Sequence, residues 1–133
     1  MDVFTPGDHG STFGGNPLAA VVGQAALTVL VEDQLIERAD KLGSYFQEQL
    51  KTIHSPLIKA IRGKGLLIGI EIDERYSAHN LCLQLLKRGI LTKETHQTVI
   101  RFAPPLIITE AQIDEVVKAL RNIFAEIDAS INW

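Results

Sequence analysis

The 133-residue chain has a length typical of a single domain and can bury a hydrophobic core of its own. Its composition, 46% hydrophobic and 22% charged, is ordinary for a folded protein, and its net charge of -3 excludes a nucleic-acid binder that works through bulk basicity. No apolar run approaches the roughly 18 residues that span a bilayer, so neither a nucleic acid nor a membrane is expected as a partner. The single cysteine, Cys82, excludes an internal disulfide framework and predicts a reducing, cytoplasmic location.

The first 16 residues predict a loop punctuated by glycine and proline, followed by a buried helix. Asn16 suits the N-cap of that helix and Pro17 suits its first turn. Residues 18–30 are apolar on nearly every side, which is typical of a helix buried all round. We expect this helix to need more apolar partners than residues 1–133 supply.

The middle of the chain predicts a helix and a hairpin. Residues 33–54 carry apolar side chains at spacings of three and four, and Ser55-Pro56 ends the pattern. Residues 57–62 and 66–73 predict two strands around the turn signal Gly63-Lys64-Gly65. An antiparallel hairpin is the simplest interpretation.

The last third predicts two helices and two short strands. Ser77 is expected to cap a helix over 78–88, and Gly89 to take a left-handed exit from it. Residues 90–92 and 98–102 are candidate strands. Thr109 and Gln112 form a capping box for a final helix with an apolar stripe over 113–127. The fold class is therefore α+β, a small and mainly antiparallel sheet with helices packed on one side, preceded by a loop and a long helix.

The loop before the first helix is the first candidate site. Ser11 and Thr12 offer hydroxyl donors, and the helix that follows directs its free N–H groups and positive dipole end toward them. A phosphate group would suit this place, although no Gly-Lys-Ser/Thr closes a Walker loop. From composition alone, a tight loop before a helix is the simpler interpretation.

Arg101 is the second candidate. Alternation places it on the strand face opposite Ile100 and Phe102, and Pro104-Pro105 stiffens the chain just beyond it. A planar guanidinium at a rigid strand end is suited to a bidentate grip on a carboxylate. From spacing alone, a surface salt bridge is the simpler interpretation.

Other reactive side chains give weaker signals. Lys64 is expected at an exposed turn tip, and nothing near Lys93 explains a lowered pKa. Glu71 and Asp73 are expected to be solvated, and Cys82 to lie in the core. The four histidines have no metal-ligand spacing, so no metal site is expected; they are His9, His54, His79 and His96.

Four motifs lie along the chain in this order: HGSTFGGNPL at 9–18, RGKGLLIG at 62–69, KETH at 93–96 and VIRFAPPL at 99–106. Together they resemble the C-terminal third of class III pyridoxal-phosphate-dependent aminotransferases, with order and intervals that fit along essentially the whole chain. The first and last motifs are specific to that class. The third and fourth are most similar to the ornithine aminotransferases, with the acetylornithine aminotransferases as the close alternative.

The resemblance implies roles for three residues. Thr12 matches the threonine that hydrogen-bonds the phosphate of pyridoxal phosphate, in the family across the dimer interface, and Ser11 stands beside it. Arg101 matches the arginine that binds the α-carboxylate of glutamate or 2-oxoglutarate. The family's Schiff-base lysine matches no position of this chain, so no catalytic residue is assigned here. The isolated chain is expected to be inactive and to hold no covalently bound cofactor.

The resemblance also implies an organisation and a reaction. Residues 1–31 would be the end of a large domain, and residues 32–133 a C-terminal small domain. The parent enzyme, a homo-oligomer, would convert ornithine and a 2-oxoacid to glutamate semialdehyde and an amino acid. Two alternatives stay open: a piece of an acetylornithine or other class III aminotransferase, and a non-catalytic α+β binding or regulatory module.

Overall fold

The computed structural model describes residue 5 and residues 7–130. The chain divides into two compact units, Met1–Leu35 and Ile36–Trp133, which are described separately below.

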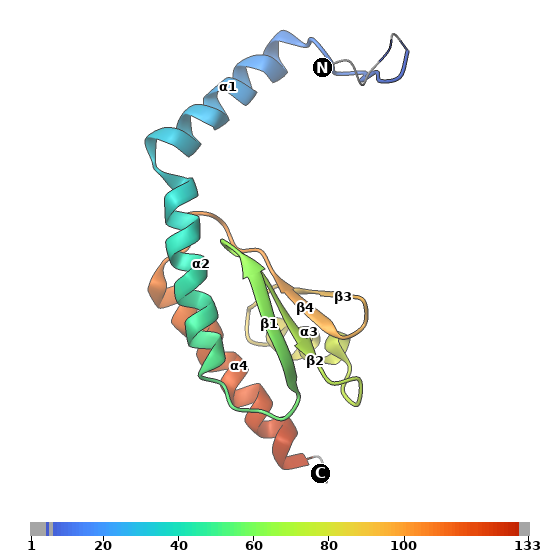
Figure 1. The fold of residues 1–133 in the computed structure, drawn as a ribbon, viewed down its shortest axis with the longest axis vertical. Coiled ribbons are helices and arrows are strands. Elements are labelled where there is room, and N and C mark those ends of the chain that lie inside the picture. The colour runs from blue at the N-terminus through green and yellow to red at the C-terminus, as the bar shows by residue number, and fades with distance from the viewer. Residues whose placement is uncertain (1–4, 6, 131–133) are drawn as a thin grey trace. The chain divides into compact units, whose positions relative to one another are not determined.

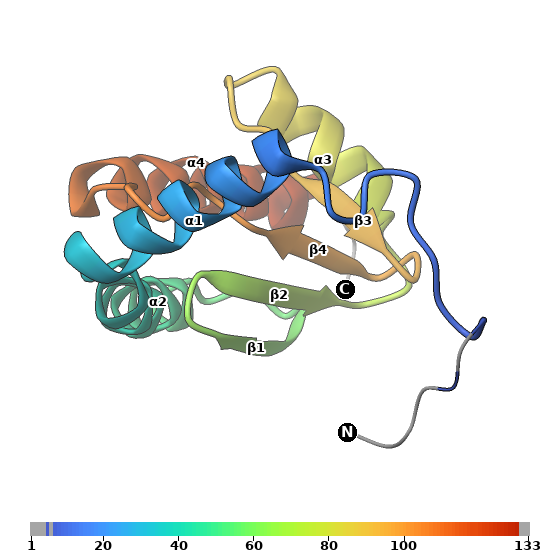
Figure 2. The same ribbon diagram turned by 90° about the horizontal axis from the view of Figure 1, so that it is seen from above.

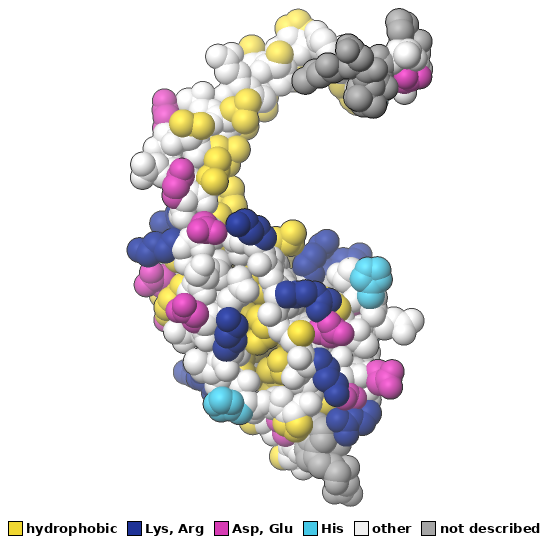
Figure 3. All heavy atoms as spheres, viewed as in Figure 1, with side chains coloured by type: hydrophobic (Ala, Val, Ile, Leu, Met, Phe, Trp, Pro, Cys, Tyr) yellow, Lys and Arg dark blue, Asp and Glu magenta, His cyan; other side chains and the backbone are white. Residues whose placement is uncertain are grey.

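The first unit consists of a loop and the helix α1 (Pro17–Glu32) (Figure 1). As expected, Asn16 caps the helix, because its side-chain oxygen accepts a hydrogen bond from the backbone N–H of Ala19 at 3.2 Å, and Pro17 occupies the first turn. No residue of α1 is buried, and Figure 3 shows its hydrophobic side chains on the surface. No single helix among the described residues is both long and apolar enough to cross a bilayer, although α1 and the next helix, α2 (Leu35–Lys51), taken together reach that length and composition.

The second unit is an α+β module, as predicted. Its helices and strands follow one another along the chain as α2 (Leu35–Lys51), β1 (Ile58–Lys64), β2 (Leu67–Ile72), α3 (Ala78–Leu86), β3 (Lys93–Thr95), β4 (Val99–Phe102) and α4 (Glu110–Ser130).

The four strands form one antiparallel sheet in the order β1-β2-β4-β3 (Figures 1 and 2). The sheet thus joins two hairpins, β1–β2 and β3–β4, through the β2–β4 pair. A register shift between Ile58 and Ala60 interrupts the pairing of β1 with β2. Alternate residues of the central strands are buried, because one face of the sheet packs against helices and the other is open.

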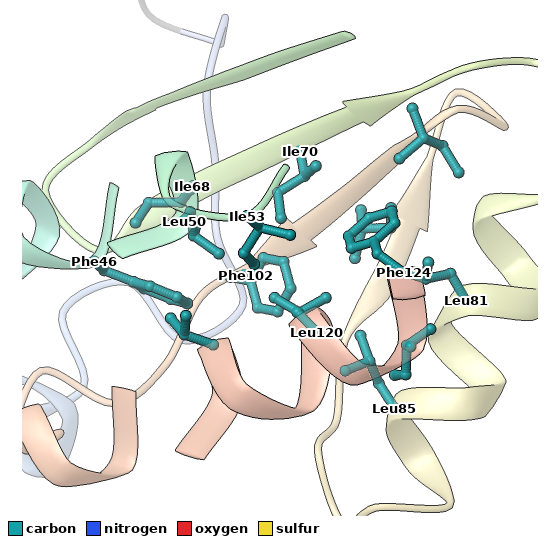
Figure 4. Packing of buried hydrophobic residues seen from close by; sticks show 14 of the residues in the cluster. Phe46, Leu50, Ile53, Ile68, Ile70, Leu81, Leu85, Phe102, Leu120 and Phe124 are labelled. Carbon is teal, nitrogen blue, oxygen red and sulfur yellow. The ribbon is translucent and has the colours of Figure 1, made fainter. Parts of the chain in front are cut away.

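The core lies between the inner face of the sheet and α2, α3 and α4. Figure 4 shows the sheet residues Ile70 and Phe102 near Leu120 of α4, with Leu50 of α2 and Leu85 of α3 on either side. Two core rings, Phe46 and Phe102, meet edge-to-face with centroids 5.6 Å apart. Such a geometry is the favoured one for aromatic pairs.

A glycine contact joins α2 to the β1–β2 turn. A Cβ atom on Gly43 would lie 2.0 Å from the carbonyl oxygen of Gly65, so the helix and the turn approach as only glycine allows. Gly65 also has a positive φ of 52°. The RGKG motif therefore supplies a turn against which α2 packs with backbone on backbone.

The predicted capping residues are found at both ends of α3 and at the start of α4. Ser77 accepts a hydrogen bond from the backbone N–H of Asn80, and Gly89 has a φ of 80° beyond α3. The capping box is also present: Thr109 Oγ1 accepts from the Gln112 N–H at 3.3 Å, and Gln112 Oε1 accepts from the Thr109 N–H at 3.0 Å.

Two strand predictions were wrong in their limits. Residues 90–92 form no strand; β3 lies over Lys93–Thr95 instead, where it pairs with β4. Lys64 is the last residue of β1 rather than a turn tip, because Gly63 and Lys64 pair with Ile68 and Leu67. Apolar alternation did not reveal either limit, since both depend on pairing with a neighbouring strand.

Candidate functional site

Arg101 lies in the middle of β4 on the open face of the sheet. Its neighbours in the strand, Ile100 and Phe102, are both buried in the core, so the backbone at Arg101 is anchored on both sides. The guanidinium itself is exposed. The loop after β4 is held as well, because the Arg38 side chain of α2 donates a 2.7 Å hydrogen bond to the carbonyl oxygen of Ile108.

A row of basic residues crosses the open face of the sheet at Arg101. The strand register places Arg62 of β1 opposite Gly69 of β2, Gly69 opposite Arg101, and Arg101 opposite Lys93 of β3. Residues directly opposite each other in an antiparallel pair point to the same face. The row therefore holds three cationic side chains and, between the two arginines, a glycine with no side chain.

An ion pair engages one end of this row. Arg62 Nη1 contacts Glu71 Oε2, with both side chains partly exposed. Glu71 follows Gly69 by two residues on β2, so it shares the face and stands diagonal to both arginines. Glu71 thus forms an ion pair with Arg62, and the expectation that it is merely solvated was incomplete.

Asp73 was predicted to be solvated, and that prediction was wrong. The residue is only 7% exposed and lies just after β2, where Lys59 and Arg75 bind its carboxylate. Arg75 donates from its side chain and from its backbone N–H, and these hydrogen bonds, with that of Lys59, hold the pKa of the Asp73 carboxyl far below its ordinary value. Alternation in the sequence predicts the face on which Asp73 lies, but it does not show that Lys59 and Arg75 cover the carboxylate.

The loop before α1 presents two free hydroxyls. Ser11 and Thr12 are exposed, and neither side chain is hydrogen-bonded within the described residues. The loop turns tightly, since the Gly14 N–H donates to the Ser11 carbonyl at 3.1 Å and Gly15 has a φ of 76°. Two hydroxyl donors beside the start of a 16-residue helix fit a phosphate group.

The two candidate sites lie in different compact units. Ser11 and Thr12 belong to the first compact unit, and Arg101 belongs to the second. Two hollows of the second unit have linings that do not include Arg101: Arg88 and Gln112 belong to one lining, and Tyr76 and His79 to the other.

Two other candidates, Cys82 and His79, are buried or paired within the second unit. Cys82 lies in the core, as predicted, and burial raises the pKa of its thiol. His79 Nδ1 lies 3.0 Å from Glu94 Oε1, which joins α3 to β3 on the helix side of the sheet. No group of three or more His, Cys, Asp or Glu residues is placed to hold a metal ion in the described part of the chain.

Comparison with known proteins gives the family. The model of the class-III aminotransferases matches residues 1–124. The chain belongs to the class-III aminotransferase family. It is 55% identical over 125 residues to an ornithine aminotransferase of Staphylococcus carnosus, and 56% identical over 124 residues to ornithine aminotransferase 2 of Staphylococcus aureus strain Mu50. These matches cover 94% and 93% of this chain but 31% of each relative, so the chain spans about a third of their length.

Solved structures show the same class-III fold. The ornithine aminotransferase of Toxoplasma gondii superposes with a TM-score of 0.86 at 41% identity, covering 98% of this chain and 32% of that one. The acetylornithine aminotransferase of Elizabethkingia anophelis superposes with a TM-score of 0.84 at 49% identity, covering 95% and 34%. The resemblance found in the four motifs is thereby confirmed, and aminotransferases of this class use pyridoxal phosphate.

The class-III match favours an aminotransferase over a stand-alone binding module, and it leaves the roles of Ser11, Thr12 and Arg101 as predictions. Sequence reasoning dismissed Lys93 as a Schiff-base candidate and did not place it opposite Arg101. The only sequence signal for that pairing is the closeness of KETH to VIRF, because register is visible only once the hairpin is formed.

Proposed function

We propose that this chain is the C-terminal part of a pyridoxal-phosphate-dependent ornithine aminotransferase. The whole enzyme would transfer an amino group from ornithine to a 2-oxoacid and so give glutamate semialdehyde and an amino acid. Relatives named as ornithine aminotransferases, at 55% and 56% identity, support this substrate. The observation that carries the proposal is Arg101, an exposed guanidinium fixed between two core residues on the open face of the sheet.

Arg101 would bind the carboxylate of the amino-acid or oxoacid substrate. Its strand position limits backbone movement, so less freedom is lost when the planar guanidinium accepts a ligand. Glu71, the nearest diagonal carboxylate, is engaged by Arg62 and leaves Arg101 available. Bidentate binding would fix the orientation of the substrate as well as its affinity.

Thr12 and Ser11 would hold the phosphate end of the cofactor. Among the described residues neither hydroxyl has a hydrogen-bond partner, and the N-terminal end of α1 adds a favourable dipole. When bound, pyridoxal phosphate supplies the electron sink of the reaction, and the protein supplies binding and orientation. The family's covalent lysine matches no residue of this chain, so we expect the isolated chain to be catalytically inactive.

Acetylornithine is the second candidate substrate. It is favoured by one specific observation, the 49% identity to the acetylornithine aminotransferase of Elizabethkingia anophelis. Both substrates carry the α-carboxylate that Arg101 would bind, so the role of Arg101 is common to the two. The KETH motif at 93–96 favours ornithine.

Two further properties belong to the same proposal. A homo-oligomer is supported by the apolar and exposed surface of α1, which includes Leu18, Val21 and Leu27. A cytoplasmic location is supported by the single, unpaired Cys82.

Titration of the 133-residue chain with 2-oxoglutarate, followed by NMR at low ionic strength, tests the role of Arg101. We expect saturable shifts at β4 and its neighbours, and a loss of binding of about tenfold or more in Arg101→Gln. The matched control is Arg121→Gln on α4, whose guanidinium donates to Thr52 instead, and which should bind as the parent chain does. Equal binding by the Arg101→Gln variant would refute the proposed site.

A further inference from the structure

The pairing of Lys93 with Arg101 places two cations directly opposite each other on neighbouring strands. Opposed residues of an antiparallel pair have Cα atoms roughly 4.5–5.5 Å apart and side chains on the same face. Like charges in this position destabilise a sheet. Both side chains are exposed, so burial in a core does not account for the arrangement.

The nearby carboxylates make their close contacts with other residues. Glu71, diagonal to Arg101 on the same face, contacts Arg62. Glu94, the next residue after Lys93, pairs with the buried Ile100 and contacts His79 of α3, so it lies on the helix side of the sheet. Within the described residues, neither Lys93 nor Arg101 forms a salt bridge, and Glu94 acts on Lys93 only through a charge–charge interaction beside its contact with His79.

Arg101 has an uncharged neighbour on its other side. It faces Gly69, which has no side chain of its own and which the Val99 side chain approaches, since a Cβ atom on Gly69 would lie 3.3 Å from Val99 Cγ1. Beyond Gly69 lies Arg62, which contacts Glu71. A small anion lying over this row would meet the free guanidinium and the ammonium together. It would also remove the repulsion between them.

We propose that Lys93 is a second carboxylate-binding residue, which grips the same substrate carboxylate as Arg101. This inference rests on the proposed function and extends it by one residue. Arg101 supplies the two parallel donors of a planar fork, and Lys93 supplies a point charge from the neighbouring strand. The substrate class is a carboxylate of an amino acid or a 2-oxoacid, and the cost of opposing two cations is offset when that carboxylate binds.

The experiment measures two quantities on the 133-residue chain at low ionic strength. The first is the affinity for 2-oxoglutarate by NMR titration, and the second is the thermal unfolding midpoint without ligand. We expect Lys93→Gln to weaken binding by about three- to tenfold, as for the loss of one charged contact. The same change should raise the unfolding midpoint, since it removes a like-charge pair.

Three further variants complete the design. Lys93→Glu should form an ion pair with Arg101, raise the midpoint further and abolish binding, whereas Lys93→Arg should keep both the charge and the binding. The matched control is Lys64→Gln, an exposed strand lysine opposite Leu67, which should leave the affinity unchanged. Inorganic sulfate serves as a second probe, and it should bind more weakly than 2-oxoglutarate.

The outcomes separate this inference from the function beneath it. If Arg101→Gln loses binding while Lys93→Gln keeps it, Lys93 merely protects the sheet edge and the inference fails alone. If neither variant changes the affinity, both the inference and the proposed role of Arg101 fail. Sulfate binding as strong as that of 2-oxoglutarate would overturn the assignment of a carboxylate site.

Discussion

The environment of a charged side chain in this protein depends on which oppositely charged residues contact it. Alternation along a strand predicts the face of both Asp73 and Arg101. Asp73 is buried between two cationic side chains, whereas Arg101 is exposed and has no partner among the described residues. The difference arises from residues outside the strand of each. Lys59 and Arg75 both contact Asp73, whereas Glu71, the carboxylate diagonal to Arg101, contacts Arg62 instead. Sequence spacing gave the face of each residue but not its partner.

The Asp73 cluster predicts a pH dependence. The pKa of the folded carboxyl lies below that of an unfolded aspartate, about 3.9, so the ionised form stabilises the fold. This contribution is fully present above about pH 4 and is lost as the pH falls toward the folded pKa. We expect Asp73→Asn to unfold at lower denaturant concentration than the parent chain at pH 7, and the difference to shrink below pH 4.

Denaturant unfolding between pH 2 and pH 8 measures this difference. Asp40→Asn is the control, because Asp40 is exposed on α2 and has no ion pair within the described residues. Its curve should follow that of the parent chain throughout. A gap between parent and Asp73→Asn that stayed constant over the whole range would show that Asp73 does not act through its charge.

At the scale of helices and strands, local signals predicted several helix ends in both units. The caps at Asn16, Ser77 and Thr109 and the exit at Gly89 are satisfied by neighbouring backbone, so they were readable from short stretches. The limits of β1 and β3 could not be predicted from the sequence, because they are set by hydrogen bonding to the neighbouring strands β2 and β4. The contact of α2 with the β1–β2 turn was also missed, since it joins two glycines far apart in the sequence.

That contact predicts a large effect of one methyl group. Gly43→Ala would place a Cβ atom 2.0 Å from the Gly65 carbonyl oxygen, so α2 or the turn must shift. We expect a loss of about 1–3 kcal/mol in the free energy of unfolding, although alanine is the better helix former.

Chemical denaturation of Gly43→Ala beside Ser44→Ala provides the comparison. Ser44 is exposed on the same helix, and its replacement should change stability by no more than about 0.5 kcal/mol. Equal stability of the two variants would mean that the helix and the turn do not approach as closely as described.

The whole chain combines an α+β unit that has a hydrophobic core of its own with a helix, α1, that has no buried residue. The second unit has a continuous core between its sheet and three helices, whereas no residue of α1 is buried. The apolar character of residues 18–30 predicted a need for further partners, and a chain that spans about a third of its relatives is consistent with that need. The family was predictable because four motifs kept their order. Thr12 and Arg101 lie in separate compact units, and the order of the motifs does not place one relative to the other.

We propose that this chain carries the phosphate-binding and carboxylate-binding groups of an aminotransferase but not the lysine that anchors the cofactor. Borohydride reduction of the 133-residue chain with pyridoxal phosphate, followed by peptide mass spectrometry, examines every lysine at once. We expect low and scattered labelling over several exposed lysines. One pyridoxyl group per chain at a single lysine, such as Lys64 or Lys93, would contradict it.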